Sequence, residues 1–190
     1  MARVKLNPAL ATFLGQLGEL VFKMRYGKMY ASRKPEARPH VFTAAQKAAQ
    51  GRFREATRYA KRVMADPEAR VAYDMAAKEK DAPVQSVIIA DFLRSPSIDE
   101  MDLTKYDGRA GSAMRIRASD DFDVVSVEVV ISMSTGEVIE RGMAILSSMK
   151  WGSWIYRATA TVATGTRITV AATATDRPGN TSTKSVETQV

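Results

Sequence analysis

Hydrophobic and polar residues alternate with a period of two through much of the second half of the chain, residues 112–190. This alternation predicts short strands with one buried face, and the turn-forming stretches 134–136 and 164–166 separate them. Such a series of strands is typical of an antiparallel β-sandwich. The alternating apolar positions are Met114, Ile116, Ala118; Val125, Val127, Val129, Ile131; Trp154, Tyr156, Ala158, Ala160, Val162; and Ile168, Val170, Ala172, Ala174.

Residues 42–95 change to the helical period and predict a basic domain of three helices. Thr43 with Gln46 three residues later forms a capping-box pattern at the start of the first helix, which we expect to end near residue 65. Its apolar positions are Ala49, Phe53, Ala56, Ala60, Val63 and Met64.

Proline and aspartate mark the two helices that follow. Asp66-Pro67-Glu68 predicts a second helix to about Lys80, with Val71, Tyr73 and Met75 facing inward. Asp81-Ala82-Pro83 repeats the start signal for a third helix that ends near Arg94. Its buried positions are expected to be Val84, Val87, Ile88, Ala90 and Phe92.

The N-terminal arm, residues 1–41, predicts a β-hairpin with a turn at Tyr26-Gly27-Lys28, followed by an extended Pro-rich linker. An isolated hairpin is marginally stable in water, so we expect the arm to complete a sheet on its own chain or on another subunit. The residues expected to make these contacts are Leu20, Phe22, Met24, Met29 and Tyr30. With 96–111 as an acidic connector, the expected fold is a two-domain α+β protein.

The formal net charge is +7, and positive charge is concentrated at the front: residues 1–80 contain 17 Lys and Arg against 7 Asp and Glu. In the first helix, Lys47, Arg54, Arg58 and Lys61 recur at helical spacing, with Arg62 nearby. Such a stripe suits the phosphates of nucleic acid, although a solvated helix face explains it almost as well.

Oxygen-bearing side chains gather at two turns of the predicted sandwich: Asp120, Asp121, Asp123, Asp176 and Asn180. They are weak candidates for a Ca²⁺ site, and capping of their own turns is the favoured interpretation. The chain has no Cys and one His, His40, so a thiolate metal site and a Ser-His-Asp triad find no support. We expect no cofactor, no metal site and no enzymatic activity.

Two phrases, Arg-Ala-Ser-Asp-Asp-Phe-Asp-Val at 117–124 and Ala-Thr-Asp-Arg-Pro-Gly-Asn-Thr at 174–181, resemble those of bacterial immunoglobulin-like (Ig-like) domains. The resemblance covers residues 112–190 and implies an Ig-like sandwich used for adhesion, spacing or display. The front, with Gly15, Gly18, Val21 and Arg33-Lys34-Pro35, is similar to an uncharacterised bacterial family that begins G-K-x-G-x-x-V. Gln16 stands where that family prefers Lys, and the family implies no function.

These observations predict a structural protein that assembles through its arm, as a component of a virion-like particle or filament, with itself or a structural partner. The alternative is a DNA-binding protein of the nucleoid type that uses the basic helices. The first residues lack the apolar stretch of a signal peptide, so we expect cytoplasmic synthesis, compatible with later incorporation into a virion-like or extracellular assembly. No stretch of about 20 apolar residues predicts a membrane span.

Overall fold

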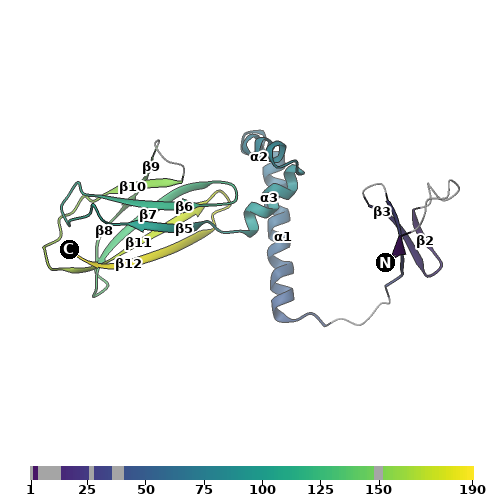
Figure 1. Ribbon diagram of the computed structural model, residues 1–190, viewed down its shortest axis with the longest axis horizontal. Coiled ribbons are helices and arrows are strands. Elements are labelled where there is room, and N and C mark those ends of the chain that lie inside the picture. Colours follow the sequence, from purple (N-terminus) through teal and green to yellow (C-terminus); the bar gives the residue numbers. More distant parts are fainter. Residues whose placement is uncertain (1, 4–13, 26–27, 36–40, 148–151) are drawn as a thin grey trace. The chain divides into compact units, whose positions relative to one another are not determined.

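A computed structural model describes residues 2–3, 14–25, 28–35, 41–147 and 152–190 (Figure 1). The chain divides into two compact units, Met1–Thr43 and Ala44–Val190. The described elements comprise three helices and three four-stranded antiparallel sheets, which confirms the expected α+β class. No helix among the described residues is long and apolar enough to cross a membrane.

The first unit is a sheet with the strand order β1-β4-β3-β2. Strands β3 and β4 form the hairpin expected from the sequence, and their register pairs Arg25 with Lys28. Two residues of the predicted turn, Tyr26 and Gly27, lie outside the described residues, and the third, Lys28, begins β4. Part of the predicted linker, 36–40, also lies outside the described residues. The strands are β1 Ala2–Arg3, β2 Gly15–Leu17, β3 Leu20–Arg25 and β4 Lys28–Arg33.

The second unit begins with the three expected helices, α1 Ala44–Ala65, α2 Pro67–Glu79 and α3 Val84–Leu93. Asp66 caps α2 as predicted: its carboxylate accepts hydrogen bonds from the backbone amides of Glu68, at 3.0 Å, and Ala69, at 3.3 Å. Pro67 then occupies the first helical position, where its missing amide costs nothing. Helix α3 begins directly after Pro83, which has no side-chain cap.

Burial of the helices differs from the sequence prediction at several apolar positions. In α2 only Tyr73 and Ala77 are buried, and the predicted inward residues Val71 and Met75 are exposed. In α1 the first buried residue is Ala56, and Phe53 is exposed. The bundle covers only one side of α2 and only the second half of α1. Apolar spacing alone therefore overstated how much of each helix is packed.

The remaining strands form two facing four-stranded sheets, with the orders β5-β6-β10-β9 and β12-β11-β7-β8. Their inward side chains share a single core that draws residues from both sheets, so the arrangement is sandwich-like. The strands are β5 Ser97–Asp102, β6 Ala113–Ser119, β7 Val124–Met133, β8 Val138–Met143, β9 Ile145–Leu146, β10 Ser153–Arg157, β11 Arg167–Asp176 and β12 Thr181–Gln189.

The alternation of apolar and polar residues in the sequence corresponds to an alternation of buried and less buried residues in the strands. In β11 every second residue is buried, from Ile168 to Ala174, and β6 and β7 repeat the pattern. Trp154 is buried in the core as predicted, whereas Trp151 lies outside the described residues. Strand β10 ends at Arg157, which is earlier than the alternation through Val162 predicts.

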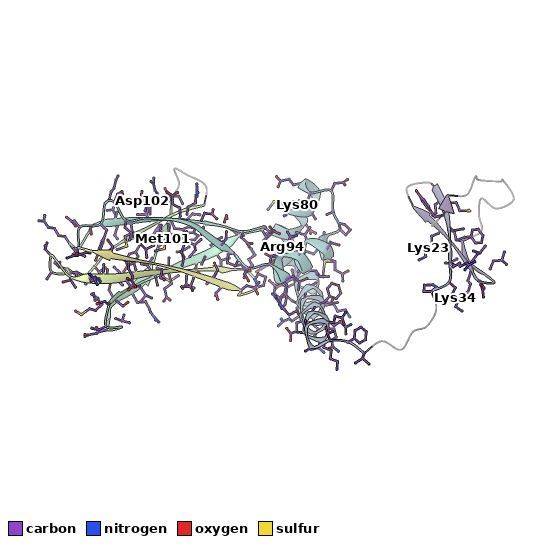
Figure 2. The ribbon with its side chains drawn as sticks, turned by 60° about the horizontal axis from the view of Figure 1, so that its bottom comes forward. Lys23, Lys34, Lys80, Arg94, Met101 and Asp102 are labelled. Carbon is purple, nitrogen blue, oxygen red and sulfur yellow. The ribbon has the colours of Figure 1, made fainter. Side chains whose placement is uncertain are left out.

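The segment expected to be a connector, 96–111, contains an ordered strand. β5 pairs with β6 at the edge of its sheet, and Ile98 enters the core. Its acidic residues suggested a solvated loop, but they face cations on the neighbouring strand: Asp102 pairs with Arg115 at 2.7 Å, and Asp99 with Arg117 at 3.7 Å (Asp102 is labelled in Figure 2). An edge strand needs only one apolar face, so few apolar residues sufficed.

Ile131 tests the shared core. Its side chain is fully buried between the sheets, so Ile131→Ala should lower the free energy of unfolding by about 2–5 kcal/mol. Val138 on the neighbouring strand is exposed, and Val138→Ala should change it by less than about 0.5 kcal/mol. Urea denaturation followed by tryptophan fluorescence measures both, and equal effects would contradict the assigned core.

Candidate interaction surfaces and a buried junction

The residues predicted for the N-terminal arm lie on the two central strands of the first unit. Register places Leu20, Phe22 and Met24 on one face of β3, with Met29 of β4 on the same face. Met29 is buried, whereas Leu20 and Met24 are exposed. Tyr30 lies on the opposite face beside Lys23, which is labelled in Figure 2. The predicted residues therefore divide between two faces, and the apolar face is only partly covered.

The cations predicted to bind nucleic acid lie on α1, and four of them share one side. Lys47, Arg54, Arg58 and Lys61, hereafter the basic face, are exposed. At 100° per residue they fall within about 60° of arc, opposite the buried Ala56 and Ala60. Arg62 differs, because its guanidinium lies over the ring of Tyr59, 5.8 Å from the centroid.

Two of the five oxygen-bearing residues considered for Ca²⁺, Asp120 and Asp176, cap their own turns. Asp120 accepts hydrogen bonds from the amides of Phe122 and Asp123. Asp176 accepts from the amides of Gly179 and Asn180, at 2.9 and 2.6 Å. Across the described part of the chain, no group of three or more His, Asp or Glu side chains is placed to hold a metal ion. His40 lies outside that part.

These two turns also hold the helices to the sandwich. The side-chain amide of Asn180 donates to the carbonyls of Phe92 and Arg94, at 3.2 and 3.1 Å, where α3 ends. From the helical side, Arg94 forms an ion pair with Asp121, and the Nζ of Lys80 donates to the carbonyl of Asp121 at 2.8 Å (Lys80 and Arg94 are labelled in Figure 2). We call this contact between the helices and the 120–123 and 176–180 turns the junction.

An aromatic stack forms the apolar part of the junction. The ring of Phe122 packs against that of Tyr73 in α2, with centroids 4.2 Å apart and planes 12° from parallel. Phe122 is thereby part of the helical core although it belongs to the sandwich loop between β6 and β7. Arg177 covers Phe122, with its guanidinium 5.6 Å from the ring centroid.

Behind this stack lies a buried carboxyl group, Asp91 of α3, which is only 1% exposed. The hydroxyl of Tyr73 donates to its Oδ2 at 2.5 Å, and the hydroxyls of Tyr73 and Tyr59 lie 3.3 Å apart. The other oxygen, Oδ1, has no hydrogen-bond partner. A buried acceptor without a partner is costly when ionised, so this site favours the protonated acid.

Burial raises the pKa of Asp91 to about 6, the hydrogen bond from Tyr73 opposes this, and the charges of Asp120 and Asp176 add to the rise. Arg177 acts in the opposite direction. Burial also raises the pKa of Asp176, and of Tyr73. The charges of Asp120, in the loop before β7, and of Asp176, at the end of β11, thus act on Asp91 of α3 across the junction.

Sequence analysis missed the junction. Asp91 interrupts an apolar helix, but it was not considered among the candidate site residues. The available signal was that the residues three and four positions before it, Ile88 and Val87, are apolar, which places Asp91 on the apolar face of α3.

No protein-family model matches the chain, and no curated protein matches it. Two solved structures are similar over about half of it. CopC from Methylosinus trichosporium OB3b is 19% identical, covers 51% of this chain and 93% of its own, and superposes with a TM-score of 0.38. A conjugative transposon lipoprotein from Bacteroides eggerthii DSM 20697 is 10% identical, covers 48% of this chain and 92% of its own, and has a TM-score of 0.25. Scores this low carry no functional argument.

The raised pKa of Asp91 predicts a stability that depends on pH. The native state binds this proton more tightly than the unfolded chain does, so the contribution of Asp91 is fully present below its ordinary pKa of about 4 and is lost as the pH rises through about 6. In urea denaturation, the wild type should lose about 1–2 kcal/mol more than Asp91→Asn between about pH 5 and about pH 7.5.

Asp81→Asn is the matched control, because Asp81 is an exposed acid in the turn before α3. It should show the same pH dependence as the wild type. Parallel curves for wild type and Asp91→Asn would contradict the assigned protonation of Asp91.

Proposed function

We propose that this chain is a non-enzymatic structural protein that assembles through its first unit, and that the sandwich serves as a spacer or display module of the assembly. The observation that carries the proposal is the first unit itself. It has the backbone of a four-stranded sheet, but Met29 is the only residue that is buried among its described positions with assigned burial, 14–24 and 29–35.

The partly covered face of this sheet supplies the apolar contact area. Leu17 of β2 pairs with Leu20 of β3, and Met24 lies farther along the same face. Their exposed fractions are 60%, 41% and 43%. Because sheets of this size gain their stability from a buried apolar face, a partner that covers these side chains would stabilise the unit.

The strand edges supply the directional contact. β2 pairs with β3 only from Leu20 to Phe22, and β1 pairs with β4 only at Tyr30 and Ala31. Among the described residues, the other positions of β3 and β4 pair with no strand on the side that faces away from the hairpin. Unpaired backbone amides and carbonyls on such an edge can accept a strand from another subunit, which is the β-augmentation expected from the sequence.

We also propose that the sandwich is Ig-like. In chain order, taking β5 to β12 as eight strands, the first, second, sixth and fifth form one sheet, and the eighth, seventh, third and fourth form the other. An Ig-type sandwich has the same order when its strands are labelled A-B-E-D and G-F-C-C′. Such a domain would separate the helices from what the assembly displays.

Removal of the first unit tests the assembly function. The full-length protein should form oligomers, and the protein lacking residues 1–35 should be a folded monomer, because both the apolar face and the strand edges are lost. Size-exclusion chromatography with light scattering measures the mass, and circular dichroism checks the fold. A truncated protein that assembles to the same mass would contradict the proposal.

A matched pair of triple variants locates the contact. Leu17→Ser, Leu20→Ser and Met24→Ser together should reduce the full-length protein to monomers. Val125→Ser, Val138→Ser and Ile145→Ser change three exposed apolar residues of the sandwich and should leave the oligomer intact. If the sandwich variant dissociates and the first-unit variant does not, the sandwich carries the assembly contact instead.

A further inference from the structure

We propose that α1 binds duplex DNA, that its first half enters the major groove, and that the basic face contacts the phosphates through Lys47 and Arg54 in that half and Arg58 and Lys61 in the turns that follow. This binding role is independent of the assembly proposed for the first unit. It rests on the placement of the helix, the charge of one side of it and the dimensions of the groove.

The first three turns of α1 extend beyond the helical bundle. Every residue from 41 to 50 is exposed, and the first buried residue of the helix is Ala56. α1 packs on α3 over its later turns, and Arg52 marks the boundary, because its guanidinium donates to the carbonyl of Leu93 at the end of α3, at 3.2 Å. A free helical cylinder of about 10–12 Å in diameter fits the B-DNA major groove, which is about 12 Å wide.

The four cations of the basic face lie on one side of the helix without an acid among them, which suits contact with a polyanion. The sole acid of α1, Glu55, lies about 60° or more around the helix from each residue of the basic face. No described ion pair involves any of the four cations. They extend over about 21 Å of the helix axis, so their charges can reach several phosphates along a groove.

The free helix also needs an explanation in terms of stability. Three exposed turns gain little from apolar burial and are marginal in water, and Gly51 weakens the helix further. Ala44, Ala45, Ala48 and Ala49 offset this through high helix propensity and add no bulk. Small side chains on a projecting helix leave it slim enough for close approach to a groove. Phe53, exposed beside Arg54, adds an apolar surface on this half of the helix.

Fluorescence anisotropy of a labelled DNA duplex, titrated with the full-length protein over a series of salt concentrations, tests the proposal. Arg54→Glu, Arg58→Glu and Lys61→Glu together should weaken binding by about 100-fold at physiological salt and lower the magnitude of the salt slope by about three. The control variant, Lys78→Glu, Lys105→Glu and Arg167→Glu, removes the same charge at exposed positions outside α1 and should bind within about threefold of the wild type. Circular dichroism checks that both variants keep their helices.

Two other ligands, duplex RNA and vesicles of anionic lipid, test whether binding depends on the shape of the DNA major groove or only on negative charge. Duplex RNA, whose major groove is too narrow for a helix, should bind at least about tenfold more weakly than DNA. Equal weakening in both triple variants would show that net charge alone drives binding and would overturn the proposal. Equal affinity for duplex RNA, or for vesicles of anionic lipid, would contradict docking in the major groove. Undetectable binding to DNA would overturn the whole proposal.

Discussion

The hydrogen bond from Tyr73 to Asp91 is the interaction on which the helical part of the second unit depends. A carboxyl group that is 1% exposed must be neutral or well paired, and here one oxygen has a single donor and the other has none. The site is tolerable because α1, α2, α3 and the Phe122 loop enclose it together. Removing any of these elements would admit water to the carboxyl group of Asp91, and the remaining elements would no longer be held together by the need to enclose it.

The same enclosure explains why the two halves of α1 differ in packing, and why the second unit has a core that the first unit lacks. Since Asn180 and Tyr73 both hold the last turn of α3, the second half of α1 packs on a fixed support and its first half stays exposed. The first unit has no comparable core, with Met29 as its buried residue in the described part. A well-packed body and a sparsely packed sheet suit a protein whose first unit gains its stability from neighbouring subunits. This division links the two proposed contacts, one through strand edges and one through a basic helix.

The strands and helix starts could be predicted because each depends on local chemistry. Alternation fixes which residues of β11 point inward, and Asp66 with Pro67 fixes where α2 begins. The exposure of Val71 and Met75, and the strand at 97–102, depended on which neighbours were present. For the same reason Asp91 could not be placed: its hydrogen-bond partner Tyr73 is 18 residues away, and Tyr59, whose hydroxyl contacts that of Tyr73, is 32 residues away in α1. The stripe of cations on α1 was visible in the sequence, but the exposure of the first half of the helix, which carries Lys47 and Arg54, was not.

Hydrogen exchange measured by mass spectrometry tests the central claim most directly, namely that the helices and the sandwich form one cooperative body closed by the junction. The account predicts that amides of α3 and of β11 open with free energies equal within about 1 kcal/mol, because neither can open without exposing Asp91 and Asn180. Exchange from α3 at a free energy several kcal/mol below that of β11 would show that the helices open alone and would contradict it.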